Sequence, residues 1–233
     1  MRALAVRAPG LDRETRRAFA RAGLEVEIAH PVRLVPLPRP RLTVGFLRRY
    51  DVVAFTSPRT VEFLEGGELR ALRESGVDVA AVGPTTGRAL EGCGLDVDVM
   101  PERFTTGALA DALRGYSRVL ALRSRRRTDE LRERLERFGA RVRELEVYDL
   151  EPWRVRVDPG DFDVVCFFSA MTARCFLRSV GTDLPEPVVS IGPVTARELE
   201  RAGLEVVTAR EPSLRGVVSA AVRVARSRSR RPP

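Results

Sequence analysis

The 233-residue sequence contains no lysine, one histidine, one tryptophan and three cysteines. Cys93, Cys166 and Cys175 show no metal-type spacing and are odd in number, so we expect reduced, mostly buried thiols. His30 has no potential ligand partner nearby in the sequence, which argues against a zinc site and against a Ser-His-Asp triad. The sequence therefore predicts no metal ion.

Long apolar runs are also missing. None approaches the roughly 18 residues of a membrane span, and the apolar stretch in MRALAVRAPG at the start is too short for a secretory signal. The phosphate loops GxGxxG and GxxxxGK are absent, which argues against a nucleotide cofactor. We expect a cytoplasmic, monomeric protein without cofactor or membrane contact.

Because lysine is absent, all 40 basic residues are arginine, and the formal net charge is +8. Five of these arginines lie in the last segment, RVARSRSRRPP (223–233), which contains no acidic residue. Such a composition is typical of a disordered end, and we expect a disordered Arg-rich tail over 225–233. The alternative is an arm that binds nucleic acid. The charge of the tail does not by itself indicate specific nucleic-acid binding.

The sequence does contain a repeat. VGPTTGRALEGCGLDV recurs as IGPVTARELERAGLEV with nine of sixteen positions identical, and two further pairs of segments match in the same order. The matched pairs are 4–28 with 120–144, 50–64 with 162–177, and 82–97 with 191–206. Three ordered matches indicate an internal duplication.

Each repeated block resembles a short apolar strand, a turn, an amphipathic helix, a glycine and a second strand. VVAFTS (52–57) is the continuous apolar run expected of a parallel strand that is buried on both faces. The helix expected before Gly23 ends as helices commonly end, at a glycine. The sequence therefore predicts an α/β fold with two doubly wound parallel-sheet domains.

Two proline-rich stretches, 30–42 and 150–160, separate these blocks and are poor helix formers. Two linkers at these places mean that the chain crosses between the domains twice, so that the N-terminal segment returns to the C-terminal domain. We expect residues 1–35 with 155–224 to form one discontinuous domain, and residues 40–149 to form the other.

Ligands of open parallel sheets bind beyond the carboxyl ends of the strands, where helices begin. Hydroxyl residues follow several predicted strands or precede predicted helices in both halves of the chain. They are Thr56, Ser57, Thr85, Thr86, Thr105, Thr106, Ser169, Thr195 and Ser213. Each can cap a helix and leave outward-facing backbone N–H groups for an anion, or serve as a cap only. Their recurrence in both halves favours a polyanionic ligand.

Several segments, in their order, are similar to those of the uroporphyrinogen-III synthase family. They are FTSPRTVEFL, VAAVGPTTGRAL, LEVYDLEP, VCFFSAMTARCF and VSIGPVTARELERAGL, and the resemblance reaches to about Val224. It implies two α/β domains joined by a two-stranded linker. It also implies a cyclising hydro-lyase of tetrapyrrole biosynthesis, on the route to heme and cobalamin, that uses no cofactor or metal.

The implied reaction closes hydroxymethylbilane, a linear tetrapyrrole polycarboxylate, into uroporphyrinogen III in the interdomain cleft. Loss of hydroxide gives an azafulvene, and attack through a spiro intermediate inverts the last pyrrole ring. Confinement supplies most of the selectivity over the symmetrical isomer I, which forms spontaneously. We also expect a transient contact with the preceding enzyme of the pathway.

The resemblance also implies site residues. Tyr148 matches the family's candidate for the general acid, a role that suits a phenol because it stays protonated at neutral pH. The alternative is that Tyr148 only packs at the end of a strand. The residues expected to bind substrate are Arg7, Thr56, Ser57, Gly83, Pro84, Thr85, Thr105, Arg123, Ser124, Ser169, Gly192, Pro193 and Thr195. The alternative for Arg7 and Arg123 is a solvated surface position. Val194 replaces the counterpart of Thr85, so the two Gly-Pro turns differ.

A second hypothesis of function stays open at this point. A two-domain protein with the same fold and anion sites would bind a polycarboxylated small molecule without any chemistry. Formation of the III isomer from hydroxymethylbilane separates the enzyme from the binding protein.

Overall fold

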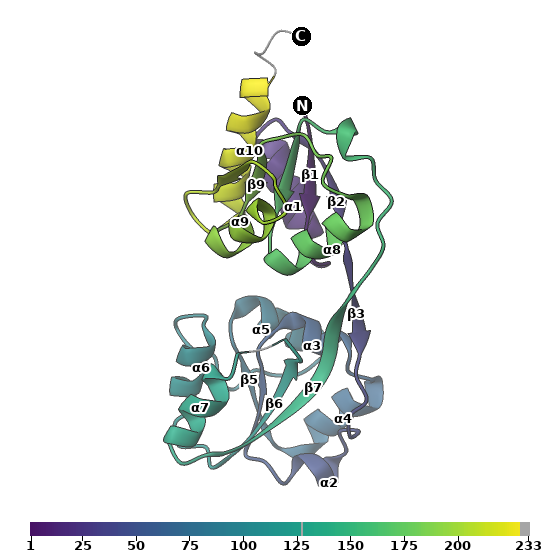
Figure 1. Ribbon diagram of the computed structural model, residues 1–233. Helices are drawn as coiled ribbons and strands as arrows, with labels where there is room; N and C mark the ends of the chain where they lie inside the picture. Colours follow the sequence, from purple (N-terminus) through teal and green to yellow (C-terminus); the bar gives the residue numbers. More distant parts are fainter. Residues whose placement is uncertain (127, 229–233) are drawn as a thin grey trace. The chain divides into compact units, whose positions relative to one another are not determined.

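The computed structural model describes residues 1–126 and 128–228 (Figure 1). The chain forms two compact units. Unit 1 comprises Met1–Leu34 and Leu150–Pro233, and unit 2 comprises Val35–Asp149. These bounds differ from the expected domain bounds 1–35, 40–149 and 155 by at most five residues.

Unit 1 is built on a five-stranded sheet in the order β10-β9-β8-β1-β2, with all neighbouring strands parallel. The strands are β1 (Arg2–Val6), β2 (Glu25–Ala29), β8 (Val164–Phe167), β9 (Val188–Ser190) and β10 (Val206–Thr208). The helices are α1 (Asp12–Arg21), α8 (Ala170–Val180), α9 (Pro193–Glu200) and α10 (Leu214–Arg228), with a short 3-10 turn at Pro159–Asp161.

The two faces of this sheet are covered by different helices. Phe19 of α1 and Val217 of α10 belong to the apolar core on one face. Phe176 of α8 and Leu199 of α9 belong to the core on the other face. Since every residue of β8 is buried, the continuous apolar run VVCF is explained by burial on both faces.

Unit 2 is built on a sheet in the order β3-β7-β6-β4-β5. The strands are β3 (Val32–Pro36), β4 (Val52–Phe55), β5 (Asp78–Ala81), β6 (Arg118–Ser124) and β7 (Arg141–Pro152). β4 pairs in parallel with β5 and with β6, and β6 pairs in parallel with β7. The helices are α2 (Val44–Leu47), α3 (Pro58–Glu62), α4 (Gly66–Ser75), α5 (Pro84–Glu91), α6 (Thr106–Ala112) and α7 (Glu130–Arg137). Leu109 and Leu113 of α6 pack with Leu131 and Leu135 of α7 in one apolar cluster with the sheet.

The α/β fold with parallel sheets that the sequence predicts is confirmed. The strands of the matched blocks also occupy equivalent places in the two sheets. The order β2-β1-β8-β9 in unit 1 corresponds to the order β7-β6-β4-β5 in unit 2. In the place that β10 has in unit 1, unit 2 has a single parallel bridge between Ala80 and Val99. Each sheet thus takes two strands from one copy of the repeat and the others from the second copy.

Each of the two proline-rich stretches lies partly in a strand, 32–36 in β3 and 150–152 in β7. β3 and the end of β7 are neighbours in the sheet, and each crosses the boundary between the units. Arg33 on β3 forms an ion pair with Glu151 on β7 (3.2 Å), and its guanidinium lies 4.7 Å from the centre of the Trp153 ring. Prolines in both stretches exclude a helix but are compatible with edge strands.

The prediction of a disordered tail over 225–233 is wrong for its first residues. α10 continues to Arg228, and Ala221, Val224 and Ala225 are buried in the core of unit 1. These apolar residues recur at helical spacing, and their burial outweighs the effect of the arginines between them. Residues 229–233 lie outside the described part of the chain.

Candidate active site

The carboxyl ends of the parallel strands of unit 2 lie side by side. Phe55, the last residue of β4, is in register with Ala81 of β5 and Leu122 of β6. Ser124 of β6 is in register with Tyr148 of β7 after a local irregularity. This edge, which we call the unit 2 edge, therefore brings together Thr56, Ser57, Gly83, Ser124 and Tyr148.

Three helices begin at the unit 2 edge or beside it. The Ser57 hydroxyl accepts a hydrogen bond from the Arg59 N–H at the start of α3 (3.2 Å). The Thr105 hydroxyl accepts one from the Ala108 N–H at the start of α6 (3.1 Å). Gly83 begins α5 with Pro84 in the first turn, and Thr85, the next residue, is exposed. Each of these residues lies at a helix start, as the sequence predicts.

Tyr148 is the aromatic residue of this edge. Its side chain is 7% exposed and stacks on Phe63, with ring centres 5.4 Å apart and an interplanar angle of 16°. Its main-chain oxygen accepts a hydrogen bond from the Arg125 N–H (3.0 Å). Within the described residues its hydroxyl has no hydrogen-bond partner. The ring is held by stacking while the hydroxyl stays available.

Arg123 does not lie on the surface. Its side chain is 3% exposed and forms an ion pair with Glu144 (2.7 Å), and it donates a hydrogen bond to the Thr128 oxygen (3.0 Å). The alternative of a solvated surface position is therefore wrong for Arg123, and its contact with substrate stays a prediction. A guanidinium that satisfies a buried carboxylate has a structural role, because removing it would leave a buried charge unpaired.

Two arginines that sequence analysis overlooked follow directly after Arg123. Arg125 forms an ion pair with Glu146 (2.9 Å), and Arg126 forms one with Asp149 (2.9 Å). Both are exposed and lie in the loop after β6, next to the strand that carries Tyr148. The run SRRR after a predicted strand was a usable signal, but arginine is so frequent in this chain that the run did not stand out.

The carboxyl edge of the unit 1 sheet, the unit 1 edge, repeats part of this pattern. The Ser169 hydroxyl accepts a hydrogen bond from the Thr172 N–H at the start of α8 (3.2 Å). Gly192 begins α9, with Pro193 in its first turn. Thr195 is 4% exposed, and its contact with substrate stays a prediction. Val194, which replaces the counterpart of Thr85, is 66% exposed.

Arg7 at the unit 1 edge is buried too. It donates a hydrogen bond to the Thr15 hydroxyl, and its guanidinium lies 4.7 Å from the centre of the Phe168 ring. The alternative of a solvated surface position is wrong here as well, and the contact of Arg7 with substrate stays a prediction. Its equivalence to Arg123 in the repeat extends to burial, and both arginines fix the loops that surround them.

A histidine and an aspartate that sequence analysis did not connect meet beside Arg7. The His30 ring lies 2.9 Å from the Asp12 carboxylate through Nε2 and 3.0 Å from the Arg7 oxygen through Nδ1. Burial raises the pKa of Asp12, but the hydrogen bond and charge of His30 outweigh it, with help from the Gly10 N–H and Arg7, and lower the pKa overall. Asp12 is therefore charged at neutral pH and anchors the start of α1.

Within the described residues, no helix is long and apolar enough to cross a membrane, and no group of three or more histidine, cysteine, aspartate or glutamate residues is placed to bind a metal ion.

The family model described as uroporphyrinogen-III synthase HemD matches residues 13–219. This chain belongs to the uroporphyrinogen-III synthase family. A candidate uroporphyrinogen-III synthase of Methanothermobacter thermautotrophicus is 31% identical over 194 residues, which cover 73% of this chain and 77% of the relative. The uroporphyrinogen-III synthase of Chlorobaculum parvum is 29% identical over 183 residues, which cover 69% and 73%.

Solved structures of uroporphyrinogen-III synthases have the same fold. The Helicobacter pylori structure aligns with a TM-score of 0.67 at 18% identity and covers 96% of this chain and 100% of that one. A mutant Thermus thermophilus structure aligns with a TM-score of 0.51 at 20% identity and covers 97% and 99%. Membership of the matched family makes the chain a cyclising lyase of tetrapyrrole biosynthesis, as the sequence predicts, and it favours the enzyme over a binding protein without chemistry.

The two Gly-Pro turns of the chain differ in what surrounds them. A Cβ added at Gly83 would lie 2.9 Å from Cβ of Phe104, a residue that is itself 59% exposed. A Cβ added at Gly192 would meet nothing closer than Pro212, at 3.9 Å. Both glycines have extended backbones that any residue adopts. Only the turn in unit 2 therefore needs glycine, and the need comes from Phe104.

We expect Gly83→Ala to displace Phe104 and the start of α5, with a loss of about 1–3 kcal/mol of unfolding free energy because overpacking is costly. The matched variant Gly192→Ala should stay within about 0.5 kcal/mol of the wild type. Urea denaturation followed by circular dichroism measures both. Equal effects of the two substitutions would contradict the role given to Phe104.

Proposed function

We propose that this chain converts hydroxymethylbilane into uroporphyrinogen III with inversion of the last pyrrole ring, and that the carboxyl edges of both sheets bind the substrate. The observation that supports this most is the recurrence of equivalent helix starts at the two edges. Ser57 and Ser169 cap helices after equivalent strands, and Gly83 and Gly192 begin helices after the next ones. Backbone N–H groups at helix starts favour carboxylates.

Carboxylate binding would then rest mainly on the first turns of α5, α8 and α9, with Thr56, Thr85, Thr105 and Ser124 as additional hydroxyl groups. Arg125 and Arg126, which the sequence did not suggest, are charged candidates for the same task because they are exposed beside Tyr148. Arg7, Arg123 and Thr195 would position these loops from inside. Such a site supplies many weak contacts and few reactive groups.

Tyr148 would lend a proton to the departing hydroxyl, which leaves as water, and the proton that the pyrrole releases would restore the phenol. The hydroxyl that leaves hydroxymethylbilane departs more easily when it accepts a proton or a hydrogen bond, and the pyrrole nitrogen pushes it out to give the azafulvene. Tyr148 suits this role because Phe63 fixes its ring while its hydroxyl has no partner within the described residues. Selectivity for isomer III would come from confinement of the azafulvene, since spontaneous closure gives isomer I.

The test is one turnover experiment with freshly prepared hydroxymethylbilane. After oxidation, chromatography separates the porphyrin isomers, and we expect isomer III in the presence of the protein and isomer I in its absence. An isomer ratio that the protein leaves unchanged would contradict the proposed function.

We also infer that the protein works in the cytoplasm. We infer in addition that it contacts the preceding enzyme of the pathway transiently, because hydroxymethylbilane closes spontaneously and a direct transfer would limit the amount lost to isomer I. Cys93, Cys166 and Cys175 are all unpaired, as suits a reducing compartment. Cell fractionation followed by immunodetection of the chain measures whether the protein is in the cytoplasm.

A further inference from the structure

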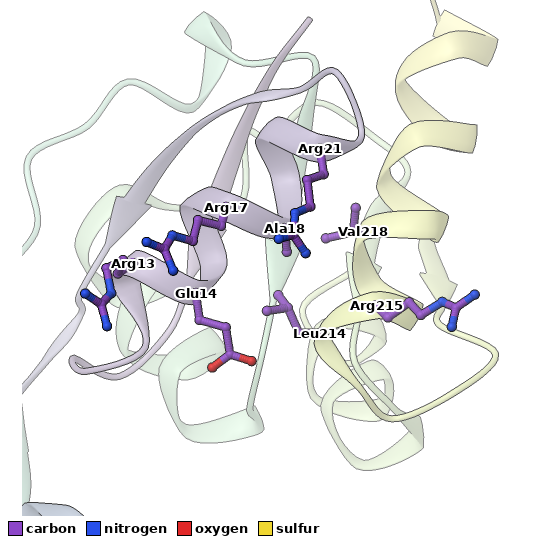
Figure 2. A pocket seen from close by; sticks show the side chains of 8 residues that line it. All are labelled: Arg13, Glu14, Arg17, Ala18, Arg21, Leu214, Arg215 and Val218. Carbon is purple, nitrogen blue, oxygen red and sulfur yellow. The ribbon is translucent and has the colours of Figure 1, made fainter. Parts of the chain in front are cut away.

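Unit 1 carries a groove between α1 and α10, on the helical layer that covers one face of its sheet. The groove has a volume of about 560 Å³. Figure 2 shows Arg13 and Arg17 on the α1 side and Arg215 on the α10 side, with Leu214 and Val218 facing α1. None of the residues that line it belongs to the strand ends described above.

Three of the arginines form a regular row. Arg13, Arg17 and Arg21 are spaced by four residues, so they lie along one face of α1 about 6 Å apart. Like charges at this spacing repel and weaken the helix that carries them. The row is therefore a cost to α1 unless an anion lies beside it.

Some arginines of the chain have an acidic partner. Arg134, for example, pairs with Asp111 (2.7 Å), and Arg174 pairs with Glu198 (2.7 Å). Arg13, Arg17, Arg21 and Arg215 form no ion pair within the described residues. In α7, by contrast, three glutamates accompany three arginines.

The floor of the groove is apolar. Ala18, Leu214 and Val218 lie between the two rims and continue into the core of unit 1. Glu14 is the only acidic residue among those that line the groove. An apolar floor with guanidinium rims suits a ligand with an apolar body and several carboxylates, because guanidinium groups bind carboxylates through paired hydrogen bonds. A nucleic-acid backbone would leave this floor uncovered.

We propose that this groove is a second binding site for a tetrapyrrole polycarboxylate, separate from the two carboxyl edges. The inference rests on the proposed function in one respect only, namely that such molecules are the ligands this protein meets. The volume is in the range of small-molecule sites, and a site of this kind would hold substrate or product close to the protein without reacting with it.

Uroporphyrin is a suitable probe because it is a stable ring with the carboxylate side chains of the product. Hydrogen exchange with and without uroporphyrin should show protection of residues 12–21 and 214–226. The triple variant R13Q/R17Q/R21Q should lose this protection and weaken binding there at least tenfold, while its turnover of hydroxymethylbilane to isomer III stays within twofold of the wild type.

Two further variants separate a binding role from damage to the fold. Glu14→Gln should tighten uroporphyrin binding severalfold, an effect of opposite sign that unfolding cannot imitate. R178Q/R197Q/R201Q removes three exposed arginines from α8, from α9 and from the residue that follows α9, and it should leave the protection of α1 and α10 unchanged. The proposal is overturned if α1 and α10 show no protection, or if the two triple variants behave alike. It is also overturned if poly-glutamate or RNA binds the groove more tightly than uroporphyrin does in a competition experiment. A wild-type protein without turnover would contradict the proposed function instead, and the binding measurements would still decide this site.

Discussion

A Glu68→Gln variant is expected to lose about 3 kcal/mol of unfolding free energy, because it breaks a buried ion pair from one side. The Glu68 side chain is 2% exposed. Both of its oxygens accept hydrogen bonds from Arg39, at 2.5 and 2.8 Å, and the Leu42 N–H donates another (3.0 Å). Glutamine would keep the shape but leave the Arg39 charge without its counter-charge. Urea denaturation followed by circular dichroism measures the loss.

The effect should extend beyond α4. Arg39 also donates a hydrogen bond to the Phe63 oxygen (3.2 Å), and Phe63 stacks on Tyr148. Glu68 therefore ties the segment after β3 to the residue that supports the Tyr148 ring. Glu62→Gln is the matched control. Glu62 forms an ion pair with Arg59, but its side chain is exposed, so this pair should contribute less than about 1 kcal/mol to the unfolding free energy.

The loss should depend on pH in a defined direction. Burial raises the pKa of Glu68, but hydrogen bonds from Arg39, Leu42 and Glu65 and the charge of Arg39 outweigh it and lower the pKa from 4.5 to about 2. As the pH falls, the unfolded chain takes up the proton before the folded chain does, which destabilises the folded state. The difference in unfolding free energy between wild type and variant should therefore be largest above pH 5 and decrease towards pH 2. A difference that stays constant to pH 3 would contradict the role of the charged carboxylate.

The fold was predictable because its signals extend over many residues. The repeat and the two proline-rich stretches together require that the chain cross twice between the sheets, and the strand order has this property. The caps Ser57 and Ser169 were predictable because a hydroxyl after an apolar run is a local signal. The start of the tail was predicted wrongly because the many arginines suggested disorder. The helical spacing of the buried residues Val217, Ala221 and Val224, which indicates that a helix continues into this segment, was not taken into account.

Burial of charged residues could not be predicted. Arg7 and Arg123 follow apolar strands just as a substrate-binding arginine would, and only the structure places Glu144 beside Arg123 and Phe168 beside Arg7. Glu144 lies 21 residues from Arg123, so their pairing depends on the register of β6 and β7 rather than on any local pattern. The same holds for the contact of Phe104 with Gly83.

Tyr148→Phe is expected to lower kcat for isomer III about 100-fold, which is the lower end of what a positioned general acid contributes. KM and stability should change little, because phenylalanine can keep the stacking on Phe63 and the hydroxyl has no partner within the described residues to lose. Isomer I should increase in the product, since more hydroxymethylbilane closes spontaneously before it is used. Initial rates with isomer analysis measure all three quantities.

Tyr116→Phe is the control that separates this chemistry from the loss of any phenol in unit 2. Tyr116 lies before β6, at the opposite end of the strands, and donates a hydrogen bond to Asp78 (2.6 Å). Burial, together with the hydrogen bond to Asp78 and its charge, raises the pKa of Tyr116 to about 12, so this hydroxyl keeps its proton and its partner. Its removal should therefore cost about 1–3 kcal/mol of unfolding free energy and leave kcat unchanged. Opposite outcomes are thus expected for two tyrosines of the same unit, one changing rate without stability and the other stability without rate. Full activity of Tyr148→Phe would instead mean that Tyr148 only packs at the end of β7, and the proton would have to come from another group at the carboxyl edges or from water.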